Sequence, residues 1–192
     1  MRALLKYNTM RVVKQKSMEQ ISFISKTIDD FREFFKIDKE IKSFPVISKI
    51  NEVISLLKPQ FASSDIQITL EQDCDCSVCG YPNEFMQVIL NILNNAKDAI
   101  IQTKKEGGLI KITTQCQTNA CVTTIEDNGG GIEKQVIEKI FDPYFTTKAP
   151  DKGIGIGLYM AKTIIEKHMD GAINVTNTEN GALFSIMLPR TK

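Results

Sequence analysis

Apolar residues recur at steps of three and four over residues 17–36, with polar residues between them. This spacing predicts an amphipathic helix whose apolar seam packs against another helix, as in a dimerisation or bundle helix. The seam stops upstream, where Ser17 and Lys14 fill its next positions, so residues 1–16 have no defined pattern. The seam itself consists of Ile21, Ile24, Ile28, Phe31 and Phe35.

A polar stretch separates this helix from the rest of the chain. Residues 38–43 are mostly charged or polar, and Pro45 follows them. Such a composition is typical of a linker. We therefore expect a partial helical dimerisation segment over residues 1–43 and a second, larger domain over residues 44–192.

The larger domain mixes the two hydrophobic periods. Alternation of apolar and polar residues predicts strands, and steps of three and four predict helices. We expect strands over residues 66–70, 73–78, 109–114, 121–127, 172–177 and 182–188. We expect helices over residues 47–57 (stopped by Pro59), from Pro82 to before Gly107, over 134–140 and over 155–168. Regular βαβ alternation is missing, so the prediction is an α+β fold: a two-layer sandwich of helices and a mixed, mostly antiparallel sheet.

The composition indicates a globular protein, because 42% of the 192 residues are hydrophobic and 24% are charged. A net charge of +1 gives no bulk attraction to nucleic acid, and we find no nucleic-acid-binding motif. No apolar run reaches the roughly 18 residues of a membrane span, and the first residues do not resemble a signal peptide. We expect a cytoplasmic protein without a nucleic-acid partner. Whether a longer parent protein is membrane-anchored stays open.

The five cysteines, in a chain without a secretory signal, favour reduced thiols. Cys74, Cys76 and Cys79 form CDCSVC, which suggests a metal site, but a tetrahedral site takes a fourth ligand and no CxxC or CxH pair accompanies them. Cys116 and Cys121 flank a predicted hairpin turn and could face each other across it. We expect ordinary, unpaired thiols in all five positions.

Amide and carboxylate side chains gather on one face of the helix that begins at Pro82. In NILNNAKDAI, Asn91 and Asn95 are four residues apart, with Gln87 one turn earlier and Asp98 close by. Such a row can hold a hydrated magnesium ion and phosphate oxygens. Taken alone, the stretch could equally be the polar side of a surface helix.

A glycine-rich stretch, EDNGGGI, follows the strand over residues 121–127. Asp127 there can accept a hydrogen bond from an exocyclic amine, and Gly129 and Gly131 let a flat base approach the backbone closely. An ordinary glycine turn is the alternative.

The stretch IFDPYFTTK, residues 140–148, combines aromatic and polar residues. Its aromatic residues are expected to fix a loop onto the core, and Thr147 and Lys148 are suited to reach phosphate. A simple hydrophobic loop anchor is the alternative. The aromatic residues are Phe141, Tyr144 and Phe145.

The stretch GIGIGL places Gly153, Gly155 and Gly157 before a helix, with Leu158 next. Backbone amides at a helix N-terminus attract phosphate through unpaired N–H groups and the helix dipole. The motif does not follow a strand and lacks GKS/T, which argues against a dinucleotide-binding βαβ unit and a Walker-type loop.

In this order, the four stretches resemble the asparagine, first glycine, aromatic lid and second glycine boxes of bacterial sensor histidine kinases. The resemblance covers residues 44–192 and implies the Bergerat ATP-binding fold, with ATP and Mg²⁺ as cofactors. It implies that Asn95 binds Mg²⁺, that Asp127 contacts the adenine amino group, and that Asn91 and Lys148 act at the phosphates as catalytic residues. The other nucleotide contacts it implies are Asp98, Gly129, Gly131, Thr147, Gly153, Gly155, Gly157 and Leu158.

The position of Asn91 bears on the kind of reaction. In gyrase-type and mismatch-repair ATPases of the wider fold, a glutamate one helical turn before the magnesium asparagine activates water. A carboxamide cannot act as a general base. Asn91 therefore favours phosphoryl transfer to another side chain over hydrolysis.

The helix over residues 17–36 resembles the second helix of the family's dimerisation and phosphotransfer hairpin. This implies a homodimer through the N-terminal helices, a histidine-bearing helix or domain, and a response regulator as partners. Residues 1–65 contain no histidine, and the single histidine, His168, is expected to cap the carbonyls that end the helix over 155–168. Two functions stay open: a kinase domain that phosphorylates a histidine outside this chain without phosphorylating itself, or a non-catalytic nucleotide-binding and dimerisation module that regulates a partner kinase.

Overall fold

The computed structural model describes residues 40–74, 76–103, 107–148 and 154–190. The chain divides into two units, Met1–Lys36 and Ile37–Lys192. The helix predicted over residues 17–36 lies outside the described residues. Strand β1 (Lys42–Pro45) overlaps the end of the expected linker over residues 38–43.

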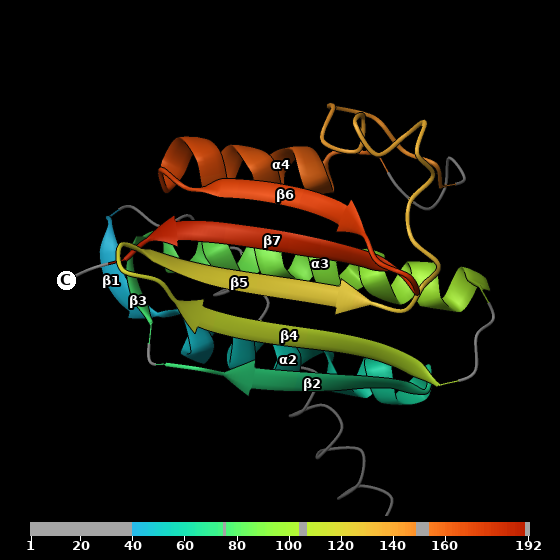
Figure 1. Cartoon of the computed structure of the whole chain (residues 1–192), viewed down its shortest axis with the longest axis horizontal. Coiled ribbons are helices and arrows are strands. Elements are labelled where there is room, and N and C mark those ends of the chain that lie inside the picture. Colours follow the sequence, from blue (N-terminus) through green and yellow to red (C-terminus); the bar gives the residue numbers. More distant parts are fainter. Residues whose placement is uncertain (1–39, 75, 104–106, 149–153, 191–192) are drawn as a thin grey trace, which may run out of the picture. The chain divides into compact units, whose positions relative to one another are not determined.

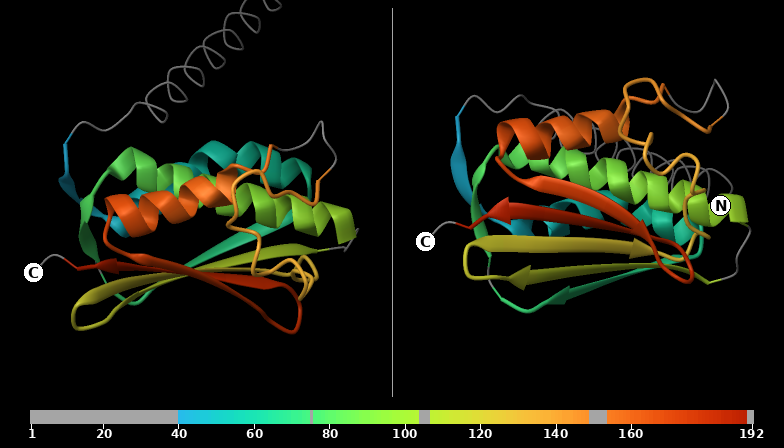
Figure 2. Two further views of the ribbon diagram at one scale, coloured as in Figure 1. Left: turned by 90° about the horizontal axis from the view of Figure 1, so that it is seen from above. Right: turned by 45° about the horizontal axis from the view of Figure 1, so that its top comes forward.

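The second unit consists of a main sheet with its helices on one face (Figures 1 and 2). Its strands are β2 (Ile66–Gln72), β4 (Gly108–Cys116), β5 (Ala120–Asp127), β6 (Ala172–Asn177) and β7 (Ala182–Pro189), in the spatial order β2-β4-β5-β7-β6. β2 pairs with β4 in parallel, and the other neighbours are antiparallel. A separate antiparallel pair joins β1 to β3 (Ser77–Gly80). The predicted two-layer α+β sandwich with a mixed, mostly antiparallel sheet is confirmed.

Alternation along the strands explains the single covered face. In β5 every second residue from Cys121 to Asp127 is buried, and the residues between them are half-buried. Successive side chains of a strand point to opposite faces of the sheet. The buried set therefore faces the helices, and Asp127 ends that set at the edge of the core.

Three helices cover this face: α2 (Val46–Ser63), α3 (Pro82–Thr103) and α4 (Gly157–Thr163), which continues into a π-helical segment η1 (Ile164–His168). α3 contacts both α2 and α4 and is the central helix. Its sheet-facing side chains are fully buried, which leaves its polar side free to form a wall. These buried residues include Phe85, Val88, Ile89, Ile92 and Leu93.

One predicted helix boundary is wrong, and one predicted helix does not form. α2 does not stop at Pro59 but continues to Ser63. A proline inside a helix loses one backbone hydrogen bond, yet Phe61 in the following turn is 2% exposed, and its burial holds that turn in place. Residues 134–140 form turns in place of the predicted helix. Only Ile140 among them is buried, which is too little apolar contact to stabilise so short a helix.

The prediction of five unpaired thiols is also wrong, because Cys74 and Cys116 form a disulfide. The parallel register pairs Gln72 with Thr114, so the residues two positions further along lie beside each other. Cys116 and Cys121 are cross-strand partners, as the predicted hairpin suggested. Among the described residues, no helix has both the length and the apolar character that a membrane crossing requires.

Candidate nucleotide site

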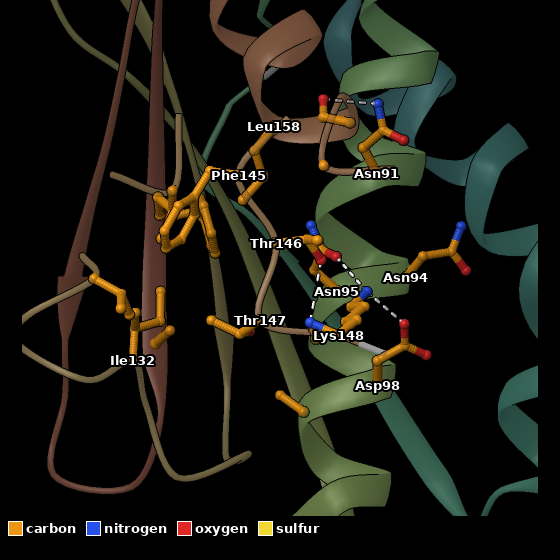
Figure 3. A pocket seen from close by; sticks show the side chains of 18 of the residues that line it. Asn91, Asn94, Asn95, Asp98, Ile132, Phe145, Thr146, Thr147, Lys148 and Leu158 are labelled. Atoms are coloured by element: carbon orange, nitrogen blue, oxygen red, sulfur yellow. Dashed lines mark hydrogen bonds and ion pairs between the residues drawn. The ribbon is translucent and has the colours of Figure 1, made fainter. Parts of the chain in front are cut away.

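A cavity of about 830 Å³ lies between the polar side of α3, the end of β5, the segment after β5 and the start of α4. Figure 3 shows its two walls, with amide and charged side chains on α3 and apolar side chains toward the sheet. The cavity is large enough for a small-molecule ligand, since such pockets span roughly 300–1,000 Å³. Its described lining comes from all four stretches that the sequence singled out.

The polar wall consists of Asn91, Asn94, Asn95 and Asp98 on α3. The steps of three and four residues place these side chains on one side of the helix, opposite the side that packs on the sheet. The Asn91 amide Nδ2 donates a hydrogen bond to the Gly157 carbonyl oxygen at 3.2 Å. This bond fixes the start of α4 against α3.

Lys148 connects the segment after β5 to this wall. Its ammonium Nζ lies 2.9 Å from Asn95 Oδ1 and 2.6 Å from Asp98 Oδ2. The Lys148 backbone N–H also donates to Thr146 Oγ1 at 3.1 Å. The oxygens of Asn95 and Asp98 thus converge on a single cation, as Figure 3 shows.

The cavity is also lined by a buried carboxylate. Asp127 is 6% exposed, and its Oδ1 accepts hydrogen bonds from the Gly129 N–H at 2.8 Å and the Ala182 N–H at 3.4 Å. No described residue donates a hydrogen bond to its Oδ2. Burial raises the pKa of the Asp127 carboxyl, while the two backbone donors act in the opposite direction. The second oxygen therefore remains available to a donor in the cavity.

At two positions of the site, the backbone conformation requires glycine. Gly155 has φ +74°, and a Cβ there would lie 2.5 Å from the Phe145 carbonyl oxygen. Gly131 has φ +81°, and its Cβ would lie 3.0 Å from Asn177 Oδ1. An L side chain is strained in this left-handed region. These glycines therefore allow two chain segments to approach each other at the mouth of the cavity.

Ten of the twelve predicted site residues line the cavity. Gly129 does not; a Cβ there would lie 2.8 Å from the Ala99 Cβ, so this glycine lets the chain pass close to α3. Gly153 lies outside the described residues. The ten lining residues are Asn91, Asn95, Asp98, Asp127, Gly131, Thr147, Lys148, Gly155, Gly157 and Leu158.

Apart from Leu158, sequence reasoning assigned no apolar residue to the site. Ile132, Phe184 and Ala182 face the cavity, and Phe184 is 4% exposed. Glu126 pairs with Leu183 across β5 and β7, which sets Ala182 beside Asp127. The signal was weak, because these residues look like ordinary strand and loop residues until the strand pairing is known.

The aromatic residues after β5 do not act as one loop anchor. Phe145 lines the cavity, and Lys162 lies over the Phe141 ring at 5.3 Å from its centroid. Tyr144, in contrast, is 72% exposed, so the prediction that it packs on the core is wrong. Its φ of +64° turns the chain, and the side chain points into solvent.

His168 lies at the end of η1 and does not line the cavity. Its Nδ1 is 2.6 Å from Glu84 Oε2 in the first turn of α3, and its ring meets the Tyr81 ring edge-on at 6.2 Å. The prediction that His168 caps the terminal carbonyls of the helix is therefore wrong. Its contacts are nevertheless structural. The contact joins the end of one helix to the start of another.

Comparison with known proteins identifies the architecture around this cavity. Residues 80–192 match the family described as histidine kinase-, DNA gyrase B-, and HSP90-like ATPase. The signal transduction histidine-protein kinase AtoS of Escherichia coli K12 is 34% identical over 176 residues, which are 90% of this chain and 28% of that protein. The sensor histidine kinase ZraS of Salmonella typhi is 41% identical over 109 residues, 56% of this chain and 22% of that protein. The chain thus spans between 22% and 28% of the length of these two relatives.

Solved structures of histidine kinases have the same fold as this chain. The catalytic domain of histidine kinase ThkA superposes with a TM-score of 0.72 at 33% identity, covering 79% of this chain and 97% of that one. A structure of ThkA in complex with the response regulator protein TrrA gives a TM-score of 0.66 at 27% identity, covering 91% of this chain and 49% of that one. The family match covers more than half of the chain, and the ThkA domain is matched almost completely. The chain therefore belongs to the histidine kinase-, DNA gyrase B- and HSP90-like ATPases, among the sensor histidine kinases.

Proposed function

We propose that this chain binds Mg-ATP and transfers the γ-phosphoryl group to a histidine that its own sequence does not contain, in two-component signal transduction. The observation that carries the proposal is the cavity, whose lining combines the buried Asp127 carboxylate with Asn91, Asn95 and Lys148. A purine amine and a polyphosphate have the complementary chemistry. The family supports ATP as the nucleotide.

At the base end, Asp127 would read adenine. Its Oδ1 is engaged by the Gly129 and Ala182 amides, which leaves Oδ2 to accept a hydrogen bond from the exocyclic amine. Ile132 and Phe184 provide apolar surface next to it for the flat ring. This arrangement selects a base with a donor at that position.

At the phosphate end, the residues supply positive charge and hydrogen-bond donors. Lys148 is the cationic group, and Asn91, held by its bond to Gly157, keeps the glycine segment against α3. Gly155 and Gly157 line the same end of the cavity, where glycine exposes the backbone N–H groups to phosphate oxygens. Transfer then depends mainly on holding the phosphates in position.

The donor set fits Mg²⁺. Asn95 Oδ1 and Asp98 Oδ2 already converge on one cation, the Lys148 ammonium, and amide and carboxylate oxygens are the ligands that Mg²⁺ prefers. We assign Asn95 as the metal ligand, with Asp98 beside it. Held by these residues, Mg²⁺ would neutralise the charge of the phosphate groups.

The residues favour transfer over hydrolysis. Asn91 has no basic group, and its amide is committed to the Gly157 carbonyl. Water therefore lacks an activating base at the position that hydrolytic relatives use. Phosphoryl transfer to an imidazole, which is itself a nucleophile, does not need one.

The acceptor lies outside this sequence. His168 is the only histidine of the chain, it pairs with Glu84, and it does not line the cavity. We propose a histidine-bearing helix or domain as the acceptor, a homodimer through the N-terminal helices, and a response regulator as the protein that next receives the phosphate. The ThkA–TrrA complex supports a response regulator as partner.

The test uses ATP labelled in its γ-phosphate and a histidine-bearing hairpin from a related kinase. We expect acid-labile label on the hairpin and none on this chain, and loss of that label in Asn95→Ala. Asn174→Ala, an exposed position on β6, is the matched control and should keep full transfer. ATP binding without transfer to any supplied hairpin would favour the regulatory module, and steady phosphate release without a hairpin would favour a hydrolase.

A further inference from the structure

Four of the five cysteines meet at the end of the sheet opposite the nucleotide cavity. The sulfur atoms of Cys74, Cys76 and Cys116 all lie within 4.8 Å of one another. Cys121 is the cross-strand partner of Cys116, which places the two side chains next to each other on the same face of the sheet. Cys121 and Asp127 lie six residues apart on β5, or about 20 Å at the rise of an extended strand.

The strand register creates this cluster. β2 and β4 pair in parallel, which brings Cys74 beside Cys116, and the β4–β5 hairpin adds Cys121. The segment that carries Cys76 is held by two backbone bonds, from the Val46 N–H to the Cys76 carbonyl at 2.9 Å and from the Asp73 N–H to the Thr114 carbonyl at 3.0 Å. Three separate segments thus carry cysteines to the same end of the sheet.

The disulfide accounts for only half of the cluster. It joins Cys74 to Cys116 and leaves Cys76 and Cys121 as free cysteines, 1% and 2% exposed. Thr114, two residues before Cys116 and on the same face of the sheet, has a buried hydroxyl without a hydrogen-bond partner. A buried hydroxyl normally has an acceptor, and a metal-bound thiolate is one.

We propose that, once the Cys74–Cys116 disulfide is reduced, Cys74, Cys76, Cys116 and Cys121 bind one tetrahedral metal ion of the zinc class through four thiolates. Zn–S bonds of about 2.3 Å place such thiolates about 3.8 Å apart. The sulfurs of Cys74, Cys76 and Cys116, within 4.8 Å of one another, are close to this spacing, and the buried Cys121 next to Cys116 supplies the fourth thiolate. An iron–sulfur cluster distributes its thiolates over several irons and needs them farther apart. The bound ion would fasten the β2–β3 connection to the β4–β5 hairpin.

The chemistry balances with a dithiol reductant. The dithiol gives two electrons and two protons to the disulfide, and its own sulfurs become a disulfide. Binding of the ion then releases the protons of the four thiols. The site depends on neither ATP nor the proposed phosphoryl transfer, so its test is independent of both.

The fifth cysteine supplies a matched control. Cys79 belongs to the same CDCSVC stretch, but it is exposed on β3, between the buried residues Val78 and Gly80. Its cross-strand partner is Ser43, whereas that of Cys121 is Cys116. Cys79→Ser therefore removes one thiol without removing a ligand.

The experiment titrates the reduced full chain with Co²⁺ and then Zn²⁺ without oxygen. We expect one Co²⁺ per chain, with the intense sulfur-to-cobalt absorption and visible bands of tetrahedral thiolate coordination, and displacement by one Zn²⁺. Affinity should fall at least tenfold in Cys76→Ser and in Cys121→Ser and stay unchanged in Cys79→Ser. A circular dichroism spectrum and a urea midpoint like those of the unaltered chain show that a variant is folded.

Three results would overturn the proposal. One is a reduced chain that takes up no stoichiometric metal. Another is full affinity in Cys121→Ser, which would exclude a four-thiolate site. The third is an equal loss of affinity in Cys79→Ser and Cys76→Ser, which would show nonspecific thiol binding. If both cluster variants fail to fold, mass spectrometry of the zinc-loaded native chain, with alkylation of its thiols, decides. Protection of four cysteines supports the site, and protection of Cys79 contradicts it.

Discussion

Replacing Asp127 with asparagine tests the base-recognition end of the site with the smallest change of shape. The amide oxygen can keep the two hydrogen bonds that Oδ1 accepts from Gly129 and Ala182. The amide nitrogen then takes the place of Oδ2 and presents a donor to the adenine amine, which is also a donor. The variant therefore removes one hydrogen bond to ATP and leaves two donors facing each other.

The expected loss follows from the charge of the acceptor. A hydrogen bond to a charged group contributes roughly 1.5–3 kcal/mol. Because about 1.4 kcal/mol corresponds to a factor of ten, Asp127→Asn should weaken ATP binding roughly 10- to 150-fold. Guanine carries an acceptor where adenine carries the amine, so the preference for ATP over GTP should fall in the same variant.

Calorimetric titration with ATP and GTP measures both effects. Glu126→Gln is the matched control, since it removes one carboxylate charge at the residue directly before Asp127. The Glu126 side chain lies on the face of the sheet away from the helices. It should bind ATP as tightly as the unaltered chain. An ATP affinity within threefold of the unaltered chain in Asp127→Asn would refute the assignment of Asp127 to the adenine contact.

The same substitution has an opposite effect on the fold. Burial raises the pKa of Asp127 above 3.8, its value in an unfolded chain. A carboxyl group whose pKa is raised by folding stabilises the folded state fully when the pH is below the pKa of the unfolded chain. This stabilisation is lost as the pH rises through the pKa of the folded chain. Asp127→Asn removes that pH dependence, so the free energy of unfolding at neutral pH should be kept or increased. Urea unfolding between pH 4 and 8 measures it; a steeper pH dependence in the variant would contradict the burial argument.

Three further substitutions separate stability from function. Lys148→Met should reduce phosphoryl transfer at least tenfold. It should change the unfolding free energy by only about 1 kcal/mol, because the ion pair of Lys148 with Asp98 is partly exposed. A loss of stability without a loss of transfer would contradict the proposed role of Lys148 at the phosphates. Gly155→Ala should destabilise the chain by about 1–3 kcal/mol and weaken ATP binding, since φ is +74° and the new Cβ meets the Phe145 carbonyl. Unaltered urea unfolding would show that the backbone there is relaxed. Pro59→Ala should raise the unfolding free energy by about 2 kcal/mol by restoring a helical N–H, and an unchanged urea midpoint would refute this.

Local patterns predicted most of the fold. The strands and the long helices depend on periods of two and 3.6 residues, which the sequence displays directly. The errors lie where packing overrides a local signal. Pro59 is a helix breaker by itself, but the buried Phe61 keeps α2 helical beyond it. Residues 134–140 carry helical spacing, but too few of them are buried to form the helix.

The candidate site divides in the same way. Asn91, Asn95 and Asp98 share one helix, so their common face follows from the sequence alone. Ala182 and Phe184 join the cavity only because β7 pairs with β5, and no spacing within β7 indicates this. Sequence reasoning therefore identified the groups proposed to contact phosphate and metal more completely than those proposed to contact the base.

The cysteines show why distance along the chain misleads where strands pair in parallel. Spacing within CDCSVC groups Cys79 with Cys74 and Cys76, but alternation along β3 turns Cys79 outward. In the folded chain, Cys116 lies beside Cys74 instead, although the two are 42 positions apart in the sequence. Paired residues of β2 and β4 are separated by the same 42 positions, beginning with Ile66 and Gly108. Once that offset is known, the cross-strand pair of Cys116 and Cys121 brings the fourth sulfur. The nucleotide motifs and the cysteine cluster therefore depend on different determinants at opposite ends of one sheet, and each can be altered without the other.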